Sequence, residues 1–474
     1  MSKEAKKFNY TVVTIAIIFT IILQISLFCK QYCNVWFDEA FTLVQVQKPF
    51  KDMWTSLVGD VHPPLYYLIC TLAKQIFGVK YRIFKFLSAL PIMIMHIWIS
   101  LLIMKEPEFR NDRKTGILLS IFILATTVTD VFLFMSTEIR MYSWAMLFVT
   151  MSGVYAYKVY KTHSISDSIL FTGMSVAAAL THYYALFMEV YIYFMLLCFI
   201  IARNRKFLKQ FGIIVLCTIA SYAWWLPVGY KQFTGVKANY WITFKFADIT
   251  SFFSQLINYD FKLEIIFFAF LLGEAIYFLY VSRQATDLNK ERIVVGILFM
   301  SVVIFTIILG LVLDVTIRPM FIFRYCMPAM GLFWLGIIVI ISQLPNHKKL
   351  FSILLVAMII FTGMNRYPIR MQNEYETGSY DSVTYIQKYS NRSDILTSNI
   401  PQLGMVLTFH FPDQTRQNMS DIDFSKTSGT YWYFEDQKNK IDKTYIKNAG
   451  FKVEKVRSGN FDNTYYYNLF KISK

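Results

Sequence analysis

Long apolar runs dominate this sequence and set the first limit on what it can fold into. The hydrocarbon core of a bilayer is about 30 Å thick, so a helix that crosses it needs roughly 20 predominantly apolar residues. We expect about eleven such spans on this criterion. They are Tyr10–Phe28, Ile83–Met104, Thr115–Met135, Tyr142–Tyr160, Ser166–Leu180, Tyr184–Ile201, Phe211–Leu226, Leu263–Val281, Ile293–Leu313, Cys326–Ile341 and Leu350–Met364. The sequence therefore predicts an α-helical polytopic membrane protein.

The composition argues against a soluble, a disordered and a nucleic-acid-binding protein. Apolar residues make up 55% of the 474 residues and charged residues only 16%. Globular domains average about 25% charged residues, and disordered chains have low hydrophobicity. The net charge of +16 would suit nucleic acid, but the cations are spread over short segments between apolar runs and form no recognisable binding module. We therefore expect no nucleic-acid partner.

The distribution of lysine and arginine indicates how the chain is oriented. With the N-terminus in the cytoplasm, the inner loops are several times denser in these residues than the outer loops, as the positive-inside rule requires. The first run lacks a small-residue cleavage site, so we expect a retained helix rather than a cleaved signal peptide. An odd number of spans then places the C-terminus outside the cell membrane. The inner cations are Lys3, Lys6, Lys7, Lys105, Arg110, Arg113, Lys114, Lys158, Lys161, Arg203, Arg205, Lys206, Lys209, Arg283, Lys290, Arg292, Lys348 and Lys349.

The first outer segment, Cys29–Arg82, is long and contains two amphipathic stretches. Pro49–Leu57 and Leu65–Phe77 are too short or too polar to span a bilayer. They are typical of helices that lie in the membrane interface. Proline is favoured in the first turn of a helix, so Pro63-Pro64 is expected to fix the start of the second stretch.

The C-terminal tail has a different, polar composition, which divides the chain into a transmembrane domain at 1–370 and an extracytoplasmic domain at 371–474. An amphipathic helix is expected at Val383–Tyr389, and a second helix at Gln437–Asn448 that stops at Gly450. Strands are expected at Asp394–Asn399, Thr430–Phe434, Phe451–Val456 and Thr464–Ile472. The tail is thus predicted to be a small α/β domain.

The informative residues are ionisable groups near the outer ends of the spans, where lipid would make them costly. Such groups usually face a water-filled cavity and mark function. An acidic pair near a histidine can supply a general base or hold a divalent cation. Arginine at this depth suits a phosphate, because the guanidinium binds its oxygens bidentately. The set is Asp38, Glu39, Asp60, His62, Asp130, Glu138, Arg140, His182, Arg318 and Arg324.

Each of these residues also has a purely structural interpretation. Asp38 and Glu39 can be solvated loop carboxylates, and Glu138 with Arg140 can form a structural ion pair. His182 can be an interface histidine whose hydrogen bonds are satisfied, and Arg324 can extend along the apolar surface toward the headgroups.

Three short motifs occur together in an order that resembles a known superfamily. They are Trp36-Phe37-Asp38-Glu39-Ala40, His62-Pro63-Pro64-Leu65-Tyr66-Tyr67 and Glu138-Ile139-Arg140-Met141-Tyr142. With Thr181-His182-Tyr183-Tyr184 and Arg324-Tyr325, they resemble membrane glycosyltransferases of the GT-C superfamily. The similarity is to the branch of protein O-mannosyltransferases and lipid A aminoarabinose transferases (glycosyltransferase family 39 and its relatives), over about Tyr10–Met364.

The resemblance implies a GT-C-like fold and an enzyme that takes a sugar from a polyprenyl phosphate on the outer face of the membrane. Asp38 matches the family's general base, and Glu39 would help to hold the acceptor or a metal. Glu138 and Arg140 match residues for acceptor positioning and donor phosphate, and Arg324 is matched as a phosphate ligand. The remaining expected donor or acceptor contacts are His62, Tyr142, His182, Tyr183 and Tyr325.

Several points stay open at the level of sequence. Glu39, His62 and His182 are candidate ligands of a divalent metal ion, and the resemblance does not decide whether one is used. The sugar, hexose or pentose, and the acceptor, a glycan, lipid or protein of the cell envelope, are undetermined. A transporter or flippase of lipid-linked saccharides is the main alternative, although transport sites lie near the bilayer midplane and the charges here lie on one face. A second alternative function is that of a sensor or scaffold protein built around the outer tail.

Overall fold

The computed structural model describes residues 2–31, 35–235, 250, 253–281, 287–376, 380–461 and 465–474. The chain forms two compact units. The first contains Met1–Ser26, Trp54–Leu72 and Lys85–Pro368, and the second contains Leu27–Met53, Ala73–Phe84 and Ile369–Lys474. The second unit thus combines the C-terminal tail with two pieces of the first outer segment. The predicted boundary between residues 370 and 371 stays a prediction.

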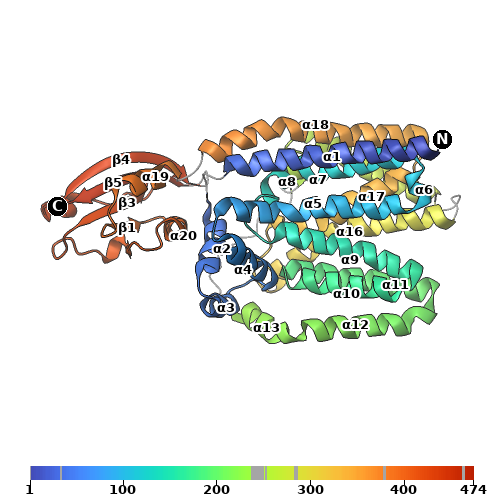
Figure 1. The fold of residues 1–474 in the computed structure, drawn as a ribbon, viewed down its shortest axis with the longest axis horizontal. Coiled ribbons are helices and arrows are strands. Elements are labelled where there is room, and N and C mark those ends of the chain that lie inside the picture. Colours follow the sequence, from blue (N-terminus) through green and yellow to red (C-terminus); the bar gives the residue numbers. More distant parts are fainter. Residues whose placement is uncertain are drawn as a thin grey trace. The chain divides into compact units, whose positions relative to one another are not determined.

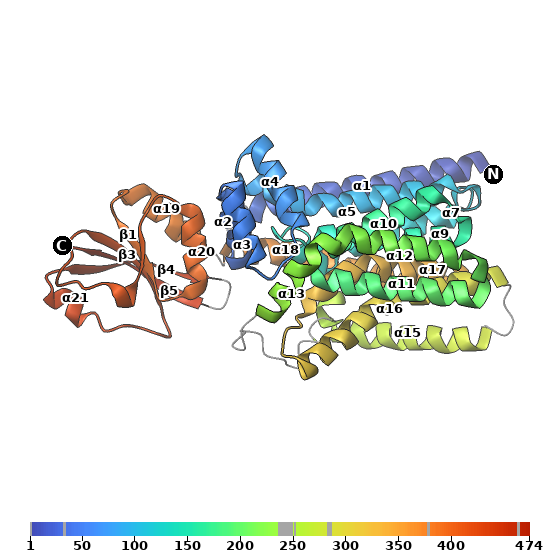
Figure 2. The same cartoon turned by 90° about the horizontal axis from the view of Figure 1, so that it is seen from below.

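The first unit is a bundle of long helices that run alongside one another (Figure 1; Figure 2). Seven described helices are long and apolar enough to cross a membrane. They lie within Lys3–Leu27, Tyr81–Lys105, Tyr183–Arg203, Arg205–Gly235, Lys290–Thr316, Phe323–Gln343 and Lys348–Ile369. This confirms a multi-pass, mostly helical protein, whereas the count of eleven spans stays a prediction.

The helices of the bundle begin and end close to the predicted apolar runs. In chain order they are α1 (Ser2–Gln31), α5 (Tyr81–Lys105), α6 (Pro107–Arg110), α7 (Arg113–Val128), α8 (Asp130–Met135), α9 (Tyr142–Thr162), α10 (Ile165–Ala179), α11 (Tyr183–Arg203), α12 (Leu208–Tyr222), α13 (Leu226–Gly235), α15 (Phe261–Val281), α16 (Asp287–Thr316), α17 (Met330–Gln343) and α18 (Asn346–Glu376). Two shorter helices, α3 (Phe50–Val58) and α4 (Leu65–Phe77), match the stretches predicted for the first outer segment.

One predicted span, Thr115–Met135, is broken in the structure. The helix α7 ends at Val128, and α8 starts again at Asp130. The side chain of Asn258 accepts a hydrogen bond from the backbone N–H of Asp130 at 2.7 Å. A side chain on Gly363 would come within 2.4 Å of the carbonyl oxygen of Val128, so only glycine fits there. Backbone groups freed by a break at membrane depth must find such partners inside the protein.

The C-terminal part of the second unit is built on a five-stranded sheet of order β2-β1-β3-β5-β4. The strands are β1 (Ile395–Ser398), β2 (Arg416–Asn418), β3 (Thr430–Asp436), β4 (Lys452–Phe461) and β5 (Tyr465–Ser473). The first three are mutually parallel, and β5 pairs antiparallel with β3 and β4. Sequence analysis predicted a small extracytoplasmic α/β domain for this region. The structure confirms its α/β fold.

Alternate side chains of β3 lie on opposite faces of this sheet. Tyr431 and Tyr433 pack with Ile446 of α21 (Thr444–Asn448), whereas Trp432 contacts Tyr385 of α19 (Tyr380–Tyr389). The indole N–H of Trp432 donates to Asp394 at 2.8 Å. The side-chain period of 2 in a strand explains this division.

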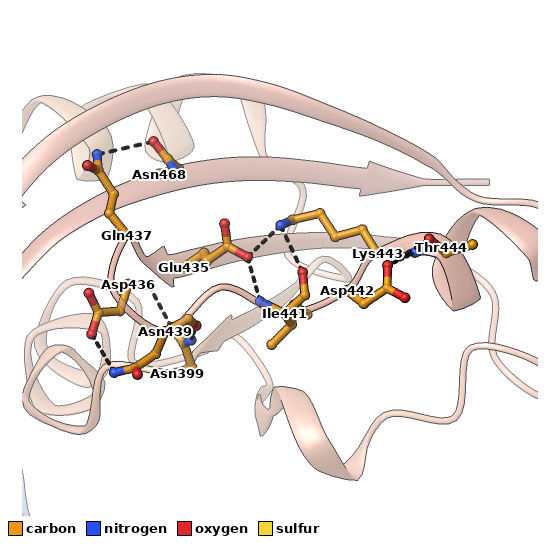
Figure 3. A network of polar contacts seen from close by, with 10 residues as sticks. All are labelled: Asn399, Glu435, Asp436, Gln437, Asn439, Ile441, Asp442, Lys443, Thr444 and Asn468. Carbon is orange, nitrogen blue, oxygen red and sulfur yellow. Dashed lines mark hydrogen bonds and ion pairs between the residues drawn. The ribbon is translucent and has the colours of Figure 1, made fainter.

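The prediction of a helix over Gln437–Asn448 was wrong for its first half. Figure 3 shows the polar network that replaces it. The carboxylate of Asp436 accepts hydrogen bonds from the backbone of Lys438 and the side chain of Asn439, and buried Glu435 pairs with Lys443. Asp and Asn side chains that bond to nearby backbone compete with helix formation, so the helix begins only at Thr444.

Candidate active site

Asp38 and Glu39 lie in the first turn of a helix in the second unit, α2 (Phe37–Gln47). Acidic side chains are stabilised there by the positive end of the helix dipole. Asp38 is half-buried, and its carbonyl accepts a hydrogen bond from Thr42. Glu39 is fully buried, and its carboxylate accepts a hydrogen bond from the hydroxyl of Tyr81 at 3.0 Å. The two adjacent carboxylates therefore have different surroundings.

The position of α2 is fixed at its other end and along its side. The ammonium group of Lys74 donates to the carbonyls of Val46, Gln47 and Lys48 at 2.8, 3.0 and 2.9 Å. A cation that binds the last carbonyls of a helix satisfies them and complements the dipole. Within the same unit, α20 (Pro401–His410) of the C-terminal domain packs against α2. The helix that carries Asp38 is thus held by contacts from two separate parts of the chain.

A second cluster lies in the first unit and is a chain of three side chains. The imidazole of His62 is 2.8 Å from Asp60 through Nδ1 and 2.9 Å from Nη2 of Arg140 through Nε2. A guanidinium can only donate, so Nε2 must be the acceptor and Nδ1 must carry the proton that is donated to Asp60. The two contacts therefore occupy both ring nitrogens of His62 and fix the orientation of its ring.

The charges around this cluster act on its neighbours. Burial raises the pKa of Asp60, but His62 and Arg140 more than offset this effect and lower the pKa below its usual value. Burial lowers the pKa of His182 well below its usual value, and Arg140 and Arg324 act in the same direction. Asp60 is thus held ionised and His182 neutral at pH 7.

His182 connects the cluster to a group of tyrosines. The residue precedes α11, and its Nδ1 accepts a hydrogen bond from the backbone N–H of Tyr184 at 3.2 Å. Its ring centroid lies 5.6 Å from that of Tyr142 and 5.1 Å from that of Tyr325. The guanidinium of Arg324 lies over the ring of Tyr142 at 5.9 Å. Residues from three distant segments therefore meet at this point.

A cavity of about 350 Å³ opens beside this group. His62, His182 and Tyr325 contribute to its wall together with Arg318, and most of the remaining wall is apolar or aromatic. The hydroxyl of Tyr183, also in the wall, donates to Gln232 and accepts from the indole of Trp225. The hydroxyl of Tyr184 is buried and has no hydrogen-bond partner among the described residues. The cavity thus combines an apolar lining with a few polar groups, as ligand sites commonly do.

The structure therefore places the sequence-predicted residues in two groups. His62, Arg140, Tyr142, His182, Tyr183, Arg324 and Tyr325 lie around the cluster and cavity of the first unit, and Asp38 and Glu39 lie in the second. Glu138 is buried in the same short loop as Arg140, and its carbonyl accepts from the backbone of Arg140. Sequence analysis placed Asp60 among the candidate ionisable groups without a specific role, and it did not single out Gln232. The spacing Asp60-Val61-His62 was the available signal for the first.

The predicted metal ligands do not form a metal site in the part of the chain that the structure describes. No group of three or more His, Cys, Asp or Glu side chains suited to a metal occurs among those residues. Both ring nitrogens of His62 are already occupied, one by Asp60 and one by Arg140. A zinc site typically takes three or four such ligands. Among the described residues, the predicted donors therefore do not fit a resident metal.

Comparison with known proteins bears on the fold. No protein-family model and no curated protein matches the chain. The crystal structure of ArnT from Cupriavidus metallidurans bound to undecaprenyl phosphate is similar, with a TM-score of 0.62, 9% identity and 97% of each chain covered. The apo structure of the same protein gives a TM-score of 0.61 at 9% identity and 97% coverage of each chain. At 9% identity this likeness shows the fold alone, and it confirms the predicted polytopic helical fold with a small C-terminal α/β domain.

Proposed function

We propose that this protein is a membrane glycosyltransferase that moves a sugar from a polyprenyl-phosphate-linked donor to an acceptor in the cell envelope, on the outer face of the membrane. The observation that carries the proposal is the arginine–histidine–aspartate chain beside an aromatic-lined cavity, within a fold shared with a protein whose crystal structure holds undecaprenyl phosphate. A buried guanidinium next to an apolar cavity suits a lipid phosphate.

The proposed reaction is a single displacement at the anomeric carbon. Asp38 takes the proton from the acceptor hydroxyl, and the acceptor oxygen forms a bond to the anomeric carbon. The bond between that carbon and the phosphate oxygen breaks, and the polyprenyl phosphate leaves with the bonding electron pair. The product has inverted configuration. A positioned general base contributes typically about 10²- to 10⁴-fold to such a step.

The other residues have supporting roles in this proposal. Arg140 and Arg324 stabilise the negative charge that grows on the departing phosphate, as preorganised cations do. Glu39, fixed by Tyr81, and Glu138 position the acceptor. His62, Tyr142, His182, Tyr183 and Tyr325 contact donor or acceptor around the cavity. His62 also keeps the guanidinium of Arg140 in place.

The test is sugar transfer by the purified full chain in vesicles that contain a polyprenyl phosphate sugar. Envelope glycan, lipid and protein fractions are supplied as separate acceptors, and the labelled product identifies which is used. The proposal expects release of polyprenyl phosphate coupled to an inverted glycosidic bond. A product that keeps the donor configuration contradicts the single displacement.

The same vesicles separate the enzyme from a transporter of lipid-linked saccharides. A transporter moves the donor between leaflets and leaves the sugar–phosphate bond intact. Donor that changes leaflet without cleavage, with every acceptor fraction present, would exclude the proposed function.

A further inference from the structure

A second cavity, of about 240 Å³, lies among α5, α7, α9, α16 and α17 of the first unit. It shares no lining residue with the cavity beside His62. None of the residues assigned to the proposed reaction contributes to its wall. It is therefore a separate feature that glycosyl transfer leaves unexplained.

The wall of this cavity is polar at one end and apolar along the rest of its length. Arg292 lies near the start of α16, Thr115 at the start of α7, and Ser342 and Gln343 at the end of α17. These termini lie at the end of the bundle where the basic loops occur. Away from that end the wall is aliphatic and aromatic, for example Val295, Phe299 and Leu335. From Arg292 to Phe299 an α-helix rises about 10 Å, so the apolar part is about that long.

Two cations lie at the polar end of the cavity. The guanidinium of Arg292 lies over the ring of Phe109 at 5.1 Å, and both residues line the cavity. The ammonium group of Lys349 donates to the carbonyl of Ser342, a third lining residue, at 2.7 Å. The neighbouring Glu291 is held by Tyr157 at 3.0 Å and by Lys161 at 2.8 Å. The polar end of the cavity is therefore positively charged.

We propose that this cavity binds an anionic glycerophospholipid, with its phosphate at Arg292 and the upper part of one acyl chain against Val295, Phe299 and Leu335. A basic pocket between transmembrane helices is an established way to recognise anionic headgroups. The apolar part is short compared with the roughly 30 Å hydrocarbon core, which suits the start of a fatty acyl chain better than a long polyprenyl chain. The site is structural or regulatory and does not depend on the proposed transferase reaction.

The experiment measures which lipids the purified full chain retains. The protein in detergent is mixed with phosphatidylglycerol and phosphatidylcholine of identical acyl chains, and bound lipids are counted by native mass spectrometry. The wild type is expected to retain phosphatidylglycerol preferentially. Arg292→Met removes the charge while keeping the side-chain length, and it should lower that preference about fivefold, the effect of one cation near a membrane surface.

Two further variants and a third lipid keep the result interpretable. Arg113→Met removes an exposed guanidinium from the same end of the bundle but outside the cavity wall, and it should leave the preference unchanged. Val295→Phe should lower retention of both phospholipids, because it fills the apolar part. Equal retention of the two phospholipids by the wild type, or equal effects of the two arginine variants, would overturn the proposal. Displacement of phosphatidylglycerol by equimolar undecaprenyl phosphate would also overturn it, since the cavity would then belong to the carrier lipid.

Discussion

The acidic and the cationic parts of the proposed active site are held in place by different physical means. Asp38 and Glu39 are carried by one short helix, whose position is set by Lys74 at its last carbonyls and by α20 along its side. Arg140 is carried by a tight loop, and its guanidinium is held through His62 by the charge of Asp60. Backbone contacts thus fix the acids, and a titratable chain of side chains fixes the cation.

Because their supports differ, the acidic and the cationic parts should respond differently to substitution. A change in the support of α2 should alter geometry without altering charge. A change in the chain from Asp60 to Arg140 should alter charge and should depend on pH. Variants that remove the reacting group, a charge partner or a helix contact should therefore differ in the size and the pH dependence of their effects.

Replacement of the proposed base should have the largest effect. Asp38→Asn keeps the size and the helix position but removes the proton acceptor, so kcat should fall about 10²- to 10⁴-fold in the vesicle transfer assay. Asp52→Asn is the control, because Asp52 is exposed and lies in α3 of the same outer segment. Wild-type turnover in Asp38→Asn would contradict the assignment of the base.

Removal of the Arg140 guanidinium should have the second-largest effect on kcat. Arg140→Met should lower kcat about 10²- to 10³-fold, the usual loss when one preorganised donor to a developing charge is removed. Arg140→Lys should recover only part of this, because an ammonium group cannot bind two phosphate oxygens side by side. The exposed Arg392 of the C-terminal domain, changed to Met, serves as the control. Full activity in Arg140→Met would remove it from the donor site.

We expect the contribution of the Asp60 charge to the free energy of unfolding to depend on pH. The pKa of Asp60 is lower in the folded protein than its usual value of 3.8, so its contribution is complete above that pH and is lost as the pH falls through the folded pKa. Asp60→Asn keeps a hydrogen-bond acceptor for His62 but removes the charge. We expect it to destabilise the protein by about 1–2 kcal/mol at pH 6, near the lower range for a hydrogen bond to a charged group.

Thermal unfolding in detergent measures this effect across pH. The difference between wild type and Asp60→Asn should begin to shrink as the pH falls below 3.8, where the unfolded state takes up a proton, and should vanish below the lower pKa of the folded state, where the carboxyl is neutral in both states. A difference that stays constant over the whole pH range would show that Asp60 acts by shape and not by charge.

The sequence was sufficient for those features that depend on local patterns. Apolar run length gave the spanning helices, and proline placement gave the start of α4 at Leu65. Four of the five strands were predicted in approximate position. The missing strand, β2, has three exposed polar residues, Arg416–Asn418, and carries no hydrophobic pattern to detect.

The features that sequence analysis missed depend on contacts between distant segments. The break between α7 and α8 needs Asn258 and the close approach of Gly363. His62 links Asp60 to Arg140, and these two residues lie 80 positions apart in the sequence. A sequence motif does not reveal which ring nitrogen of His62 accepts a hydrogen bond. The helix α2, which was not predicted, is contacted at its last carbonyls by Lys74 and along its side by α20.

The smallest effect should come from loss of the Lys74 contacts that support α2. Lys74→Met removes the cation from three carbonyls at the end of α2. Loss of such a helix-end interaction costs about 0.3–1 kcal/mol, so kcat should fall only about two- to fivefold. Lys74→Arg should restore most of the activity, and the exposed Lys80 changed to Met should have no effect. The ratio of variant to wild-type kcat should be independent of pH, because no titrating group is exchanged near neutrality. A ratio that changes with pH near neutrality would contradict a support of α2 that is independent of titrating side chains.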